Sequence, residues 1–130
     1  MADAVDSRVI YNGKRYYVVH LQNNSDGTGE SAVNKVDIST LTTADGGVCT
    51  YTAIDTIVGE VWGGEVQLVW DHTTDDKIAL LSGFVNIDWS YEGGKVDPRS
   101  AGDTGDILLT TNGFTSASGY DLTLRIRKKR

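Results

Sequence analysis

One polar segment of the chain has the residue types of a metal site. Asp71, His72, Asp75 and Asp76 lie close together in sequence, and carboxylate oxygens and imidazole nitrogens are common ligands of divalent cations. The segment has no second histidine, and its spacing matches no metal-binding template. We therefore interpret residues 71–76 as a solvated hairpin loop, and we expect neither a metal nor another cofactor.

A second segment, Asp26-Gly27-Thr28-Gly29-Glu30, has the composition of calcium-binding and phosphate-binding loops. It lacks the alternating aspartates of an EF-hand, and no Lys-Ser or Lys-Thr pair follows it as in a P-loop. A structural loop is the better interpretation.

Side chains for nucleophilic catalysis are few. The chain has two histidines, His20 and His72, and one cysteine, Cys49. No signature of a cysteine–histidine enzyme surrounds Cys49, and a lone cysteine beside Val48 is typically a small core residue. The sequence also contains no Gly-x-Ser-x-Gly motif, which marks the nucleophile of many hydrolases.

Paired carboxylates are the remaining catalytic option. Glu60 with Glu65, or Asp75 with Asp76, has the chemistry for acid–base cleavage of a glycoside, but that reaction requires a defined separation of the two carboxyl groups. Nothing in the sequence sets that separation. We therefore predict that the protein is not an enzyme.

The three tryptophans allow two interpretations. Together with the tyrosines, Trp62, Trp70 and Trp89 can form a platform on which sugar rings stack. The alternative is that Trp70 and Trp89 fill the core, while Trp62, next to Gly63-Gly64, is partly exposed. We favour the second.

The elements that carry these residues are predicted from hydrophobic periodicity. In the segment 120–127, apolar and polar residues alternate strictly, as in a strand with one face on a core and one in water. The apolar set is Tyr120, Leu122, Leu124 and Ile126.

Further strands are expected upstream. An Asn12-Gly13 turn, favoured in two-residue hairpins, joins the strands 8–11 and 15–22. Alternating or β-branched stretches predict the others, at residues 32–38, 48–58, 65–71, 77–81, 83–89 and 106–111. Loops rich in Gly, Asp, Asn and Ser separate them. We predict an all-β fold, a jelly-roll-like β-sandwich of about eight short antiparallel strands; an immunoglobulin-like sandwich has the same strand pattern and is the alternative.

Length and composition narrow the class of protein. With 130 residues, 39% of them hydrophobic, the chain can form one domain with a real core. We expect a flexible N-terminal arm at 1–7 and a single β-sandwich domain at 8–130. A single cysteine excludes an intrachain disulfide and fits a reducing cytoplasm. The N-terminus has no signal-peptide pattern, and no apolar run is long enough to cross a bilayer. A net charge of −6 disfavours nucleic acid and anionic membranes as partners.

Several short segments resemble small virion proteins of tailed bacteriophages. They are Arg-Val-Ile-Tyr-Asn-Gly-Lys-Arg at 8–15, Ser-Asp-Gly-Thr-Gly-Glu at 25–30, Val-x-Lys-Val-Asp-Ile-Ser at 33–39, Leu-Val-Trp-Asp at 68–71, Thr-Gly-Asp-Ile-Leu-Leu-Thr-Thr at 104–111 and Tyr-Asp-Leu-Thr-Leu-Arg at 120–125. The resemblance spans most of the chain, from Arg8 to Lys128, and is to capsid decoration, or cement, proteins.

The resemblance implies a β-sandwich or jelly-roll protein that clips neighbouring major capsid protein subunits together and has no catalytic residues. It further implies synthesis in the host cytoplasm and a place on the outer surface of the capsid in the virion. The expected partners are the major capsid protein and further copies of this chain, as a dimer or trimer. Alternatives are a head–tail connector, tail-tube or tail-terminator subunit, and a carbohydrate-binding β-sandwich module.

For this role we predict partner contacts at both termini, since chain ends can become ordered on binding. The loops 23–30 and 93–105 add contact surface. The C-terminus forms a basic stripe on an acidic protein, which suits an acidic patch on a partner. The candidate contact residues are Asp3, Asp6, Arg8, Arg125, Arg127, Lys128, Lys129 and Arg130.

Overall fold

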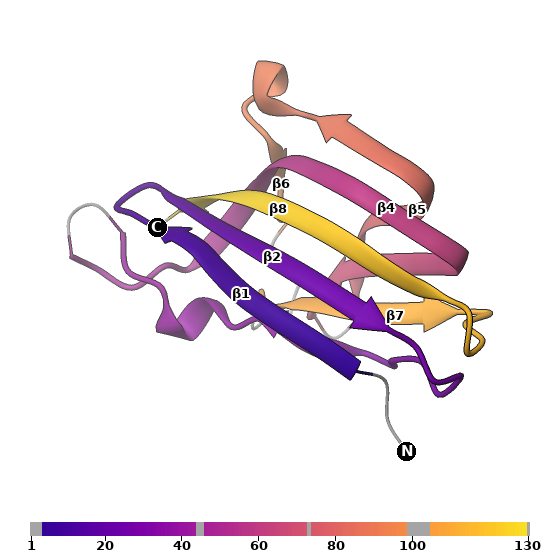
Figure 1. Ribbon diagram of the computed structural model, residues 1–130. Helices are drawn as coiled ribbons and strands as arrows, with labels where there is room; N and C mark the ends of the chain where they lie inside the picture. Colours follow the sequence, from indigo (N-terminus) through magenta and orange to yellow (C-terminus); the bar gives the residue numbers. More distant parts are fainter. Residues whose placement is uncertain (1–3, 44–45, 73, 99–104, 130) are drawn as a thin grey trace.

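The computed structural model describes residues 4–43, 46–72, 74–98 and 105–129, and these form eight strands with two short 3-10 turns (Figure 1). The strands are β1 (Ala4–Asn12), β2 (Tyr16–Asn24), β3 (Val33–Val36), β4 (Tyr51–Trp70), β5 (Asp76–Asp88), β6 (Lys95–Val96), β7 (Ile107–Asn112) and β8 (Gly119–Lys129). The turns are η1 (Ile38–Thr40) and η2 (Ser90–Glu92). All strand pairs are antiparallel, in the order β1-β2-β8-β4-β7-β3, with β5 and β6 also paired to β4. The predicted all-β, sandwich-like fold is confirmed.

The long strand β4 connects the two layers of the molecule. Its residues up to Trp62 pair with β8, whereas its residues from Glu65 onward pair with β7. The bend between these halves falls at Gly63, whose φ of 75° is readily adopted only by glycine. The bend lets one strand belong to the layer β1-β2-β8 and to the layer β7-β3.

Two pairs of predicted strands are single strands in the structure. We predicted a break between 48–58 and 65–71, and another between 77–81 and 83–89. β4 and β5 instead run through both breaks, because they form one hairpin along their length and bend together, with register irregularities at the bend. Gly83 of β5 also has a positive φ, 67°. The glycines therefore mark a bend rather than strand ends, and these two strands are longer than predicted.

The core lies between the layers and contains the predicted face of β8. Leu122, Leu124 and Ile126 are fully buried, and Tyr120 is 1% exposed. Leu124 lies across from Val19 of β2 on one side and from the equally buried Ile57 of β4 on the other. Leu68, Leu109 and their neighbours close the core from the second layer.

The N-terminal arm is shorter than predicted. We expected residues 1–7 to be a flexible arm, but β1 begins at Ala4 and pairs with β2 from that residue onward. The reason is visible in the sequence, because the alternation of Val5, Ser7 and Val9 extends the strand predicted at 8–11. Asp3 lies outside the described residues.

The C-terminus is also more enclosed than predicted. We predicted Lys128 as a contact residue of the basic C-terminal stripe, but it is 9% exposed and within β8. Its Nζ donates hydrogen bonds to Asn12 Oδ1 and, at 2.6 Å, to Gly13 O. Lys128 thus ties the end of β8 to the β1–β2 turn, and desolvation by burial lowers the pKa of its ammonium group. No helix in the described ranges is long and apolar enough to span a membrane.

Candidate binding surface

Trp62 lies on the outer face of β4, directly across from Gly119 of β8. A Cβ at position 119 would lie 2.6 Å from Cζ2 of the indole, so glycine there leaves room for the ring to pack on the β8 backbone. Trp62 remains 40% exposed, which confirms its predicted partial exposure. Trp70 is in the core at 1% exposure, and Trp89 packs against the core while partly buried.

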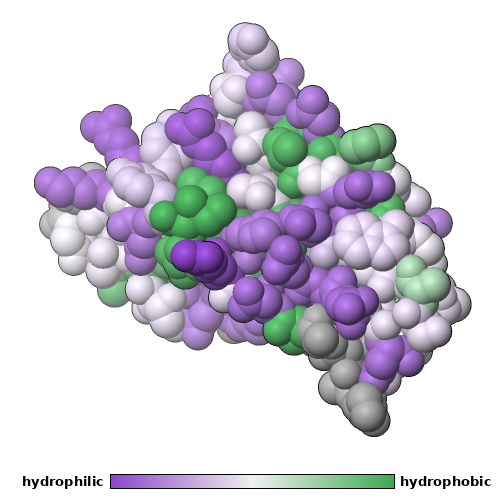
Figure 2. Space-filling view, viewed as in Figure 1, coloured by the Kyte–Doolittle hydropathy of each residue, from purple (hydrophilic) through white to green (hydrophobic). Residues whose placement is uncertain are grey.

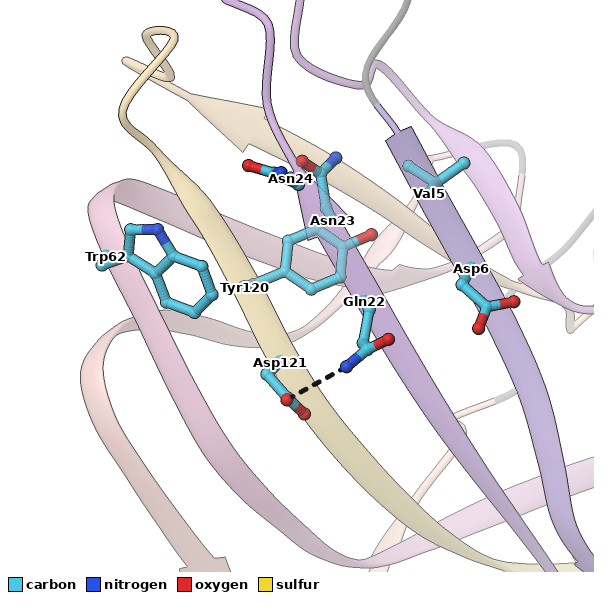
Figure 3. Close-up of a pocket in the computed structure, with 8 residues that line it drawn as sticks. All are labelled: Val5, Asp6, Gln22, Asn23, Asn24, Trp62, Tyr120 and Asp121. Atoms are coloured by element: carbon cyan, nitrogen blue, oxygen red, sulfur yellow. Dashed lines mark hydrogen bonds between the residues drawn. The ribbon is translucent and has the colours of Figure 1, made fainter.

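An open groove of about 300 Å³ runs from Trp62 across β8 and β2 to the start of β1 (Figure 3). The buried side chains of Tyr120 and Asn23 line its interior. The remaining lining residues are mostly polar: Val5, Asp6, Gln22, Asn24, Trp62 and Asp121. The groove thus combines one exposed aromatic ring with amide and carboxylate groups.

A second hollow, of about 530 Å³, adjoins the groove and shares Trp62 and Asp121 with it. It is more apolar, since Val58 is 47% exposed and Phe84 is 90% exposed. We call the exposed apolar residues of this hollow, Val58, Trp62 and Phe84, the Trp62 surface. Figure 2 shows hydrophobic side chains over β4 and β5, separated by hydrophilic ones from a second group over the end of β1.

Asp121 is the central charged group of this face. Its Oδ1 forms a short hydrogen bond with His20 Nε2, and its Oδ2 accepts a bond of 3.3 Å from Gln22 Nε2. The bond from His20, and then that from Gln22, hold the pKa of the Asp121 carboxyl below its ordinary value.

This depressed pKa predicts an acid-dependent loss of stability. A carboxyl whose pKa is lower in the folded state stabilises the fold fully above its unfolded pKa of about 3.9, and that contribution is lost as the pH falls through the folded pKa. We expect the free energy of unfolding of the wild type to fall more steeply below pH ~4 than that of Asp121→Asn. Urea denaturation of both proteins from neutral to acidic pH measures this, with Glu65→Gln as a control for loss of one exposed carboxylate. Parallel curves for wild type and Asp121→Asn would contradict it.

The loop 23–30 is fixed by a buried carboxylate. Glu30 Oε1 accepts hydrogen bonds from Tyr120 Oη at 2.6 Å and Asn23 Nδ2 at 2.7 Å, and Glu30 Oε2 lies 2.6 Å from Lys35 Nζ. The side chains of Glu30 and Lys35 are only 6% and 5% exposed. Since Tyr120 and Asn23 line the groove, these hydrogen bonds fix the position of two of its lining side chains. The segment 26–30 is therefore the structural loop that the sequence indicated.

The segment with the residue types of a metal site is not solvated throughout as predicted, because the side chain of His72 is buried in a polar cluster. His72 Nε2 lies 2.7 Å from Asp97 Oδ1 and 3.3 Å from Asp76 Oδ2, and ligand atoms of the three residues lie within 4.8 Å of one another. Asp75 instead accepts the His72 backbone N–H at 3.1 Å. The 2.7 Å contact between His72 and Asp97 is a hydrogen bond of charge-assisted length, whereas the 3.3 Å contact with Asp76 is not a hydrogen bond. We propose no metal site there.

Cys49 and the Glu60–Glu65 pair do not have the arrangement of a catalytic site. Cys49 is 2% exposed and its thiol donates to Tyr51 O at 3.1 Å. Burial raises the pKa of this thiol, which favours the protonated, non-nucleophilic form. Glu60 and Glu65 lie on opposite sides of the bend in β4, where one pairs with β8 and the other with β7.

The predicted contact residues of the C-terminus have different environments. Arg125 is exposed, with its guanidinium 4.4 Å from the ring centre of Tyr16. Arg127 Nε instead lies 2.6 Å from Oδ1 of Asp55, a buried residue of β4, and this contact with Asp55 raises the pKa of the guanidinium. Lys129 is half-buried, and Arg130 lies outside the described residues.

The predicted contact residues of the N-terminus are close together on β1. Asp6 and Arg8 are both exposed, and they lie across from Gln22 and His20 of β2. Among the described candidates, Asp6, Arg8 and Arg125 are therefore on the surface, whereas Arg127 and Lys128 hold the fold together.

Comparisons with known proteins do not assign the chain to a group. No family model matches it, and searches of curated proteins and of solved structures give no match either.

Sequence reasoning missed Asp97, Asp55 and the amide-lined groove. Asp97 and Asp55 carry no local signal, because their partners His72 and Arg127 are distant in sequence. A signal for β1 was present, since Val5, Ser7 and Val9 alternate with Asp6 and Arg8.

Proposed function

We propose that the protein is a phage capsid decoration protein, which binds and stabilises the shell of major capsid protein as a homo-oligomer on the outer surface of the virion. The observation that carries the proposal is the Trp62 surface, in which an aromatic residue that is 90% exposed, Phe84, lies in one hollow with Trp62 and Val58. Contiguous exposed apolar residues rimmed by polar ones mark protein–protein contacts.

The chemistry of the surface suits a protein partner. Exposed aromatic residues contribute most of the binding energy in many interfaces, and Glu60, Asn86 and Asp121 provide a polar rim around Trp62 and Phe84. The surface is carried by the paired strands β4, β5 and β8. Such a rigid support keeps the entropy cost of binding low, which is useful to a protein that must clip shell subunits together.

Cosedimentation with capsids tests the proposal. We expect the purified protein to pellet with shells assembled from the major capsid protein encoded with this chain. We also expect Phe84→Ala to weaken binding by about tenfold or more, as truncation of an aromatic anchor does. Tyr91 is 92% exposed on η2, outside the Trp62 surface, so Tyr91→Ala is the matched control and should bind as the wild type does. A wild-type protein that stays in the supernatant would overturn the proposal.

A head–tail connector, tail-tube or tail-terminator subunit would instead form a large ring, so a hexamer or larger in light scattering favours that alternative.

The groove beside Trp62 favours a second candidate, a carbohydrate-binding module. Its exposed indole can stack on a sugar ring, while Gln22, Asn24 and Asp6 can bond hydroxyl groups. Quenching of tryptophan fluorescence by a panel of oligosaccharides, abolished by Trp62→Ala, would support this candidate over the first.

A further inference from the structure

β1 is an open edge of the sheet. Among the described residues, β2 is the only strand that pairs with β1, so one side of the β1 backbone has no strand beside it. Such an edge is a template for pairing with another chain. Every residue from Val5 to Asn12 is exposed. The exposed residues include three aliphatic ones, Val5 at 49%, Val9 at 50% and Ile10 at 58%.

The two faces of β1 differ in chemistry. Residues across from each other in an antiparallel pair share a face, and Val9 lies across from the buried Val19, as Val5 does from the buried Asn23. Val5, Ser7 and Val9 therefore lie on the core side of the sheet. Asp6 and Arg8 lie on the outer side, and neither has an ion-pair partner within the described part of the chain.

We infer that β1 pairs with β1 of a second copy of this chain, antiparallel and across a two-fold axis at Ser7. This register places Asp6 of each copy across from Arg8 of the other on the outer face. It places Val5 across from Val9 of the other copy on the core side. Two ion pairs and two apolar pairs form at once, and the layer β1-β2-β8 continues into the second copy.

The neighbouring registers are disfavoured by charge. A two-fold axis between antiparallel strands pairs residues of the same face, so the axis must pass through one residue position, which then faces itself in the other copy. Centring the pair on position 6 opposes Asp6 to itself, and centring it on position 8 opposes Arg8 to itself. Like charges directly opposite each other are destabilising, so of the pairings centred on positions 6, 7 and 8 only the one at Ser7 opposes unlike charges.

Charged residues and bulges on edge strands commonly prevent association. Here the charges have opposite signs and are spaced so that they attract across the axis. The bulge lies between Val9 and Tyr11, at the end of the proposed ladder, where it limits the pairing to the segment before it.

This inference rests on the homo-oligomer of the proposed function and names its interface and symmetry. Since oligomer state is measured on the protein alone, failure of the interface and failure of capsid binding are separate results. A wild-type protein that is monomeric but still pellets with shells would overturn the interface and leave the decoration role standing.

Sedimentation velocity of charge-swap variants tests the interface. We expect a dimer of the wild type and, for Asp6→Arg and Arg8→Asp separately, dimer dissociation constants raised about tenfold or more, because each change turns two attractions into repulsions. Mixing the two variants should restore a dimer, since one chain then carries two cations at positions 6 and 8 and the other carries two anions there. The double variant Asp6→Arg with Arg8→Asp should dimerise alone. Circular dichroism checks that all variants remain folded.

Several results would overturn the inference. They are a wild-type monomer, a trimer, an oligomer that neither single substitution weakens, and single variants that do not associate when mixed. Recovery of the dimer on mixing would support the strand, and dimerisation of the double variant alone would support the register, because a pair centred on position 6 or 8 opposes like charges in the double variant.

Discussion

Replacement of Leu124 by aspartate is expected to unfold the domain. The side chain of Leu124 is 0% exposed, and Val19 and Ile57 lie across from it on the two neighbouring strands. The substitution removes a buried apolar side chain, which alone costs about 2–5 kcal/mol, and it places an unpaired carboxylate among aliphatic groups. Because domains of this size are typically stable by about 5–15 kcal/mol, the sum removes most or all of that stability.

Thr123→Asp is the matched control. Thr123 is the adjacent residue of β8 and is half-buried on the outer face, across from His20 and Val58. We expect Thr123→Asp to keep a cooperative thermal transition in circular dichroism, while Leu124→Asp shows none. A folded Leu124→Asp protein beside an unfolded Thr123→Asp protein would mean that the two faces of β8 are inverted.

The sequence was sufficient to predict β8 because one strict pattern determines its environment. Apolar residues at every second position need a core on one side, and the structure buries that whole set. The same alternation, through Val66 and Leu68, placed Trp70 in the core, and the structure buries it. These predictions depend only on local periodicity and on the side-chain direction in a strand.

Strand boundaries at glycines could not be predicted in the same way. Glycine ends strands in many proteins, but in β4 it permits a bend within one strand because its φ can be positive. Which of these happens depends on whether the neighbouring strands continue past the glycine. β5 does continue, and that is a property of tertiary pairing.

The buried contacts of the basic residues of β8 could not be predicted from local sequence patterns, for a related reason. Lys128 and Arg127 looked like members of one basic tail, yet each meets a partner contributed by a distant part of the chain, Asn12 and Asp55. Charge runs show only that cations are present. Their burial is decided by the strand order, which places β8 between β2 and β4.

Arg127→Ala is expected to produce the second large effect, a loss of about 3 kcal/mol in the free energy of unfolding. The Asp55 side chain is 3% exposed, and Arg127 Nε lies 2.6 Å from its Oδ1. Removing the guanidinium leaves a buried carboxylate without its cation, which is the costly way to break an ion pair. Urea denaturation at neutral pH measures the change.

Arg125→Ala separates this effect from the general loss of a basic residue on β8. Arg125 is exposed and stacks on Tyr16, a contact worth about 0.5–1 kcal/mol at exposed sites. We expect Arg127→Ala to be clearly less stable than Arg125→Ala. We also expect the double variant Arg127→Met with Asp55→Leu to recover much of the loss, because apolar side chains can replace a buried ion pair at little cost. Equal stability of the two alanine variants would show that Arg127 does not stabilise the fold, and would return it to the candidate contact residues at the surface.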